Sequence, residues 1–324
     1  KIHTHTKPLS EYKSERVKGE NYDLILGDSI EEIKNIEDDS IHLSLFSPPF
    51  ASLYTYSDSP RDMGNSQTYN EFWDHFGYLV NELYRVLIPG RIIAFHCMNV
   101  TTTISANGYI GMRDFRGALI RLFEKKGFIY HSEVVIWKDP LVQATRTKAL
   151  TLAHKQISKD ATRCGQGMPD YIVSMRKPGT NPEPVAKGRG FESYAGEMDE
   201  PTEVKKDNPR INKYSHKVWQ RYASPVWFDI RQTNTLNTKN AREKKDERHV
   251  CPLQLDTIER VIELWSNEGD IVFSPFMGIG SEGYKALLMN RKFTGIELKE
   301  SYFRESVRNI KLAEISAKGQ SSLF

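Results

Sequence analysis

The sequence is poor in cysteine. Its three cysteines, Cys97, Cys164 and Cys251, lie far apart and lack the spacing of a disulfide framework or a zinc site. This absence favours a reduced, cytoplasmic setting and a protein without a cysteine-ligated metal. The histidines His96, His154 and His249 stand on separate segments. We therefore expect core or surface roles for them, and no metal site.

The sequence also lacks long apolar runs, internal repeats and a strong charge of one sign. No apolar run approaches the length of a membrane span, and residues 1–10 lack the apolar region of a signal peptide. The formal net charge of +3 is too small to indicate a polyanionic partner by itself. With 39% hydrophobic and 27% charged residues, the composition is that of a globular domain.

Strand-like and helix-like segments alternate over residues 20–176 and again over residues 250–313. This alternation predicts an α/β fold with a doubly wound, mainly parallel mixed sheet. Residues 177–249 are instead rich in proline, glycine and charge, and include aromatic residues interleaved with basic ones. We interpret them as an insertion into the sheet domain, and residues 314–324 as a flexible tail.

Two strand ends carry groups that suit a ligand. In "VFSPFMGIGSEGYKALLMN" (272–290), a strand, a turn with Gly278 and Gly280, and a helix follow one another. Glycines let the backbone approach a ligand at a helix N-terminus, and Glu297, at the next strand end, can accept ribose hydroxyls. A Gly-x-Gly turn alone is weak evidence, because most are structural.

The second strand end is "LSLFSPPF" (43–50), where a strand stops at Ser47-Pro48-Pro49-Phe50. Two prolines commonly end a strand and begin a loop. The alternative is that a rigid turn presents polar acceptors and an aromatic face to a ligand.

Together these motifs resemble the S-adenosylmethionine-dependent DNA amino-methyltransferases, which methylate the exocyclic amine of cytosine or adenine. "FSPPF" resembles their (S/D/N)-P-P-(Y/F/W) motif, "SPFMGIGS" their D-P-F-x-G-x-G-(S/T) loop, and "GIEL" their ribose-binding strand end. "HVCPLQLDTIERVI", "LILGDSIEEI" and "ELYRVLIPGR" resemble further family segments. The likeness runs from about residue 22 to 312 apart from the insertion, and the motif order is that of the family's beta group.

The resemblance implies a Rossmann-like methyltransferase fold and S-adenosyl-L-methionine as cofactor. The cofactor-binding residues that it implies are Asp28, Pro252, Leu253, Ser274, Pro275, Phe276, Gly278, Gly280, Ser281 and Glu297. There are departures from the family pattern. Ser47 and Ser274 stand where aspartate is common, Arg91 replaces a glycine, and Cys251 replaces a proline.

The resemblance also implies a mechanism. The Ser47 hydroxyl and the Pro48 carbonyl would accept the N–H groups of the target amine, and the prolines Pro48 and Pro49 would hold these acceptors in place. Phe50 would stack on a base flipped out of the duplex. No metal and no catalytic cysteine is needed. Serine at the first motif position favours cytosine N4 over adenine N6.

The expected partner is double-stranded DNA. The insertion, together with residues 141–167, would contact phosphates and base edges, although a charged insertion is more often a solvated surface. Arg61, in the loop 55–67, would lie near phosphate. The alternatives are adenine-N6 methylation, methylation of RNA or another amine, and a non-catalytic DNA-binding or clamp-associated module.

The last residues, "AKGQSSLF", resemble the Q-x-x-L-F peptide that binds the bacterial sliding clamp. Gln320, Leu323 and Phe324 would be the anchors in a preformed groove. The alternative is an ordinary disordered terminus. The recognition sequence, a restriction-enzyme partner and a homodimer are left open by the sequence.

Overall fold

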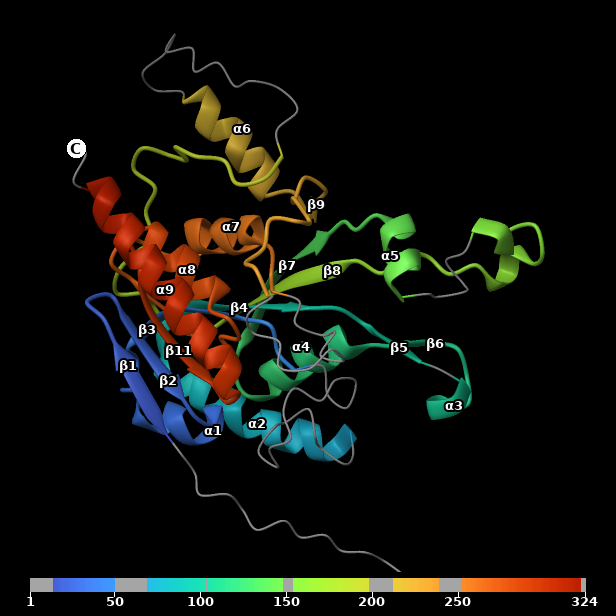
Figure 1. The fold of residues 1–324 in the computed structure, drawn as a ribbon, viewed down its shortest axis with the longest axis horizontal. Coiled ribbons are helices and arrows are strands. Elements are labelled where there is room, and N and C mark those ends of the chain that lie inside the picture. Colours follow the sequence, from blue (N-terminus) through green and yellow to red (C-terminus); the bar gives the residue numbers. More distant parts are fainter. Residues whose placement is uncertain are drawn as a thin grey trace, which may run out of the picture.

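The computed structural model describes residues 14–49, 69–102, 104–147, 154–197, 212–238 and 252–321. A nine-stranded mixed sheet, in the order β1-β2-β11-β10-β3-β4-β8-β7-β9, forms the centre of the molecule (Figure 1). Its strands are β1 (Glu15–Lys18), β2 (Tyr22–Leu26), β3 (Ile41–Phe46), β4 (Leu87–Cys97), β7 (Ile129–Ile136), β8 (Asp170–Arg176), β9 (Val226–Trp227), β10 (Ile271–Ser274) and β11 (Lys292–Glu297).

The strand directions determine which residues meet. Strands β2, β11, β10, β3 and β4 run parallel, whereas β8 is antiparallel to both β4 and β7. The carboxyl ends of the parallel strands and the beginning of β8 therefore lie at one edge of the sheet, the carboxyl edge. The predicted doubly wound, mainly parallel mixed sheet is confirmed.

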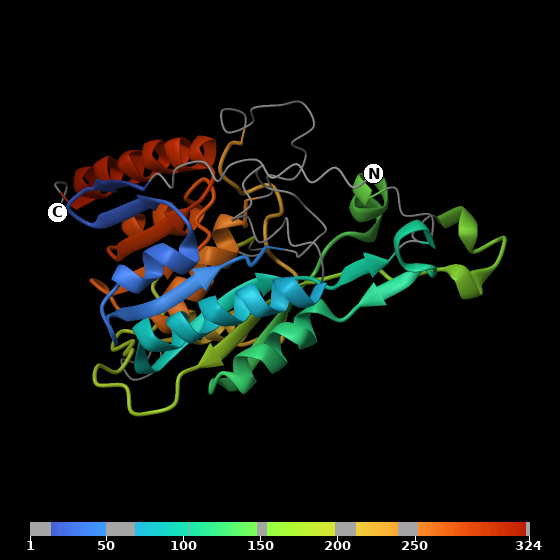
Figure 2. The same cartoon turned by 90° about the horizontal axis from the view of Figure 1, so that it is seen from below.

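Helices cover both faces of this sheet (Figure 2). One face packs against α2 (Tyr69–Val86) and α4 (Phe115–Lys125), and α1 (Ser29–Glu32) lies on the same side. The other face packs against α7 (Leu255–Trp265), α8 (Ser281–Leu288) and α9 (Glu300–Ser321). Apolar residues recur at helical spacing in these segments, so each helix presents one continuous face to the sheet.

The Pro89-Gly90 pair lies inside a strand. Helix α2 ends at Val86, and β4 begins at Leu87, before the pair. Gly90 has a φ of 78°, and a Cβ there would lie 2.5 Å from the backbone nitrogen of Asn181. Only glycine tolerates that conformation at such a close approach.

The predicted domain boundaries also need correction. Strand β1 begins at Glu15 and pairs with β2, so the sheet domain starts before residue 20. Helix α9 continues to Ser321, so residues 314–321 are helical and do not belong to an irregular tail.

The described parts of the predicted insertion pack onto the sheet domain. Strand β9 extends the sheet beside β7, and α6 (Lys213–Tyr222) packs against residues near Phe191 and against Leu264 of α7. Arg260 of α7 forms a buried ion pair of 2.8 Å with Asp229, and its guanidinium lies 5.0 Å from the Tyr222 ring centroid. These contacts attach the insertion firmly to α7.

Two other segments project beyond the carboxyl edge (Figure 2). One is the hairpin β5 (Val100–Thr102) and β6 (Gly111–Arg113), with α3 (Ile104–Asn107) between its strands. The other contains α5 (Pro140–Thr147) and the short helices η5 (His154–Gln156) and η6 (Ala161–Arg163). Within the described residues, no helix combines the length and apolarity that crossing a membrane requires.

Candidate active site

The strands bring the motif residues to the carboxyl edge. Ser47 follows β3, Ser274 ends β10, and Glu297 ends β11. Because β10 pairs with β3 on one side and with β11 on the other, the Ser-Pro-Pro turn and the glycine turn are neighbours. Ligands of doubly wound sheets bind at this kind of edge.

The glycine turn between β10 and α8 is held by Glu297. The backbone N–H of Gly278 donates to one carboxylate oxygen of Glu297 at 2.8 Å, and that of Lys299 donates to the other at 2.9 Å. A carboxylate oxygen can accept more than one hydrogen bond, so Glu297 is chemically suited to a ribose hydroxyl. The two glycines differ in what surrounds them.

A Cβ on Gly278 would meet no atom of the described residues within 4 Å, whereas a Cβ on Gly280 would lie 3.0 Å from Ile310 and 3.1 Å from Ser306. Gly278 therefore borders open space suited to a ligand. Gly280, with a φ of 86°, is required for packing and for the turn into α8.

Neighbouring loops complete this part of the site. Asp28, just after β2, caps α1 by accepting from the Ile30 N–H at 2.9 Å. The next residue, Ser29, donates its hydroxyl hydrogen to the Pro275 carbonyl. Ser281 and Ser274 are buried, and the Ser274 Oγ has no hydrogen-bond partner among the described residues. A buried polar atom without a partner, beside a turn that borders open space, fits a bound polar ligand.

Three further residues that were predicted to bind the cofactor are apolar and lie near the glycine turn. The Phe276 ring packs between Phe46 and Phe76, at centroid distances of 5.9 and 6.3 Å, so it supports the turn from the core side. Leu253 is buried in the same hydrophobic cluster as Met277, and Pro252 is half-buried beside it. No polar side-chain contact of Pro252 or Leu253 is seen among the described residues.

The Ser-Pro-Pro turn is anchored by its prolines. Pro48 and Pro49 are buried, whereas Ser47 is half-buried, so its hydroxyl is the accessible polar group of the turn. Phe50 and the loop with Arg61 lie outside the described residues.

His96 is a candidate site residue that sequence reasoning missed. We assigned it a core or surface role, but its Nδ1 lies 3.1 Å from the Ser47 Oγ. Its Nε2 lies 2.8 Å from the Oδ2 of Asp170, which begins β8. The side chains of His96 and Asp170 are only 14% and 2% exposed. The signal available in the sequence was the place of His96 near a strand end at the carboxyl edge.

Two neighbouring groups act on the Asp170 carboxylate. Burial raises its pKa, but the His96 ring and the Lys138 ammonium, 2.5 Å away, lower it by more. The pKa of Asp170 therefore lies below its ordinary value, and the group is a carboxylate at neutral pH. Cys97, next to His96, is buried in the core as expected, and burial raises its thiol pKa.

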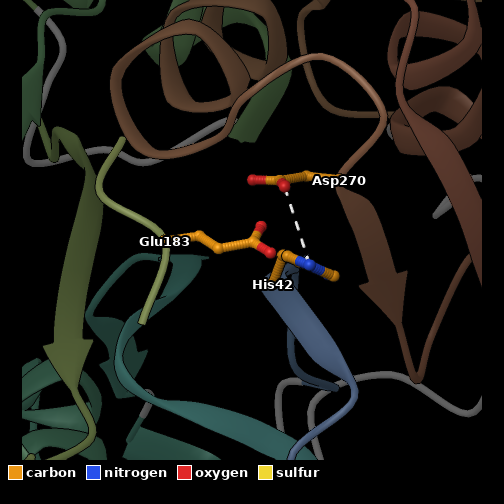
Figure 3. Close-up of side chains that lie close together, drawn as sticks. All are labelled: His42, Glu183 and Asp270. Atoms are coloured by element: carbon orange, nitrogen blue, oxygen red, sulfur yellow. Dashed lines mark ion pairs between the residues drawn. The ribbon is translucent and has the colours of Figure 1, made fainter. Parts of the chain in front are cut away.

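A second group of ionisable side chains lies at the opposite ends of the strands. His42, Glu183 and Asp270 place one ligand atom each within 4.8 Å of one another (Figure 3). The His42 Nδ1 accepts the Ile271 N–H at 3.2 Å, and Arg91 pairs with Asp270 at 2.8 Å. Because the guanidinium already neutralises Asp270, we assign the group a structural role.

Comparison with known proteins agrees with the geometry. The family model N6_N4_Mtase, described as DNA methylase, matches residues 41–308. The orphan methyltransferase M.BamHII of Bacillus amyloliquefaciens is 26% identical over 270 residues, which are 83% of this chain and 88% of that protein.

Two solved structures share the fold. The PvuII DNA methyltransferase (cytosine-N4-specific) has a TM-score of 0.59 at 16% identity, with 93% of each chain covered. The DNA modification methylase TTHA0409 of Thermus thermophilus, in complex with S-adenosyl-L-methionine, has a TM-score of 0.58 at 20% identity, with 89% of this chain and 92% of that chain covered. The chain therefore belongs to the DNA methylase family of N4-cytosine and N6-adenine amino-methyltransferases.

Proposed function

We propose that the protein transfers a methyl group from S-adenosyl-L-methionine to the N4 amine of a flipped cytosine within a specific sequence of double-stranded DNA. The observation that carries this proposal is the half-buried Ser47 hydroxyl on a rigid Ser-Pro-Pro turn, next to a glycine turn that borders open space. The two turns end adjacent strands, so an amine and a methyl donor can meet between them.

S-adenosyl-L-methionine supplies an electrophilic methyl group on its sulfonium. Glu297 would hold the ribose and Asp28 would lie towards the adenine. Pro275, Gly278 and Ser281 would line the methionine end, with the unpartnered Ser274 hydroxyl as an added polar contact. The complex of TTHA0409 with this cofactor, on a similar fold, supports the assignment.

The Ser-Pro-Pro turn would prepare the amine for reaction. The lone pair of an exocyclic amine is delocalised into the base, so the nitrogen is a weak nucleophile. The Ser47 Oγ and the Pro48 carbonyl would accept its two N–H groups and favour a tetrahedral nitrogen. Because Pro48 and Pro49 are buried, these acceptors need little reorganisation during the reaction.

Cytosine is favoured by the serine of this turn and by the similar fold of the cytosine-N4-specific PvuII enzyme. Adenine N6 is the alternative within the same family, and the adenine methyltransferase YhdJ of Escherichia coli is 34% identical over 82 residues. DNA would approach along the carboxyl edge, between the projecting hairpin, the segment 140–163 and the insertion.

Nucleoside mass spectrometry tests the proposal. DNA of varied sequence is incubated with the protein and labelled S-adenosyl-L-methionine, with Ser47→Ala in parallel. We expect label in N4-methylcytosine and a loss of about 100-fold or more in the variant, because an acceptor for the amine is removed. Label in N6-methyladenine would overturn the choice of base, and an undiminished rate in Ser47→Ala would overturn the role of the turn.

Sliding-clamp binding stays a prediction. Gln320 lies in the last turn of α9, and Leu323 and Phe324 lie outside the described residues. A pull-down with the clamp, using a chain that lacks residues 320–324 as control, tests it.

A further inference from the structure

The contacts around His96 extend the site beyond the acceptors that hold the amine. Ser47, His96 and Asp170 come from the end of β3, from β4 and from β8, and their polar atoms form a continuous chain of 3.1 and 2.8 Å. The chain runs from the half-buried Ser47 to the buried Asp170, so it connects the accessible hydroxyl of the turn to a carboxylate in the interior.

The carboxylate determines the tautomer of the ring. Asp170 can only accept a hydrogen bond, so a neutral His96 places its proton on Nε2. The Nδ1 lone pair then faces the Ser47 hydroxyl, which donates its hydrogen to the ring. The lone pairs of Oγ remain available to accept the N–H of a target amine.

We propose that His96 is the proton acceptor of the methyl transfer, reached through the Ser47 hydroxyl and held by Asp170. The inference rests on the proposed reaction at an exocyclic amine, but applies whichever base carries that amine. The nitrogen forms a bond to the methyl carbon, the carbon–sulfur bond breaks, and its electron pair stays on sulfur. The nitrogen, now positive, gives a proton to Oγ as Oγ gives its own to Nδ1. We call this path through Ser47, His96 and Asp170 the proton relay.

The resulting imidazolium is stabilised by its 2.8 Å contact with the Asp170 carboxylate and later loses its proton to water. Lys138 moderates this stabilisation, because its ammonium shares the same carboxylate. Arg116 of α4 and Glu133 of β7 neutralise each other at 2.7 Å, and the Cys97 thiol is kept protonated by its burial. Asp170 and Lys138 are therefore the charged groups in contact with this end of the proton relay.

The test compares His96→Asn with the wild type in single turnovers at saturating DNA and cofactor. Asparagine can still bond to Ser47 but cannot take up a proton. We expect the rate to fall about 100-fold, with unchanged binding of DNA and cofactor. The wild-type rate should fall on acidification, because protonation fills Nδ1, and the variant rate should be insensitive to pH over that range. His131→Asn, on the exposed part of β7, is the matched control.

Two further measurements do not depend on the choice of base. Imidazole should restore part of the rate of His96→Gly, since a free ring can occupy the space beside Ser47. Nitrogen-15 NMR of the free protein should show the neutral His96 ring protonated at Nε2, with this preference reduced in Asp170→Asn.

A wild-type rate in His96→Asn, or a neutral ring protonated at Nδ1, would overturn the proton relay. A loss that came only from weaker DNA or cofactor binding would overturn it as well. These results are separate from the base assignment, because nucleoside analysis of the wild type alone decides between cytosine and adenine. The NMR measurement tests the proton relay even if no base is labelled.

Discussion

Glu282 is an acidic residue buried in the first turn of α8, directly after the glycine turn. Burial, together with the nearby Glu297 charge, raises the pKa of its carboxyl from 4.5 to about 8. The folded protein therefore holds a proton there that the unfolded chain releases. The stability that this proton contributes is full below pH 4.5 and is lost as the pH rises to about 8.

We expect Glu282→Gln to remove this dependence. Glutamine has the same shape and stays neutral, so the variant should gain stability relative to the wild type as the pH rises through this window. Urea unfolding of both proteins at several pH values gives the difference in the free energy of unfolding. A difference that does not change with pH would contradict the assignment.

Individual residues also show what a sequence can and cannot predict. Ser47, Gly278 and Glu297 belong to local motifs, and each lies at the strand end where it was expected. His96 and Asp170 are separated by 74 positions, and their contact depends on the antiparallel pairing of β8 with β4. No local pattern reveals that pairing, so the contact between His96 and Asp170 was not predictable.

At the scale of elements, the segment after α5 carries exposed basic side chains beyond the carboxyl edge. Lys155, Lys159 and Arg163 are exposed on or near the short helices η5 and η6. We had expected residues 141–167 to assist the insertion in DNA binding. Part of the described insertion instead packs against α7. The composition of the insertion, which is rich in charged residues, does not predict this packing.

Replacing Lys155, Lys159 and Arg163 with glutamine should weaken DNA binding about equally for all sequences. The salt dependence of binding should become shallower by about one unit per lost phosphate contact. Fluorescence anisotropy at several salt concentrations measures both effects. The control changes Lys125, Arg308 and Lys311, which are exposed on α4 and α9. Equal effects in the two triple variants would argue against a specific basic path.

At the scale of the whole molecule, a buried ion pair joins two parts of the sheet that are 179 positions apart in the sequence. Arg91 of β4 and Asp270, just before β10, are 2% and 5% exposed and lie 2.8 Å apart. Arg91 also donates to Asn181 at 3.0 Å, which fixes the beginning of the insertion. The arginine that departs from the family's glycine is thus a structural link at the edge away from the active site.

Arg91→Met should lower the free energy of unfolding by about 3 to 5 kcal/mol, because it leaves Asp270 buried without its counter-charge. The double variant Arg91→Met/Asp270→Asn should recover much of this loss. Urea unfolding near neutral pH measures both. If Arg91→Met were as stable as the wild type, the prediction would be wrong, because solvent or another group would then stabilise the Asp270 charge without Arg91.

The pairing of β3 with β10 has a consequence for how the chain acquires its activity. The Ser44 hydroxyl donates to the Phe273 carbonyl at 3.2 Å, across 229 positions of sequence. During synthesis, β3 leaves the ribosome long before β10 exists, so the edge of β3 that pairs with β10 stays open until β10 has emerged. Contacts of such long range make folding slow and leave intermediates prone to aggregation. Nascent chains thus have a long period in which chaperones matter, and methylation can begin only after β10 has paired with β3.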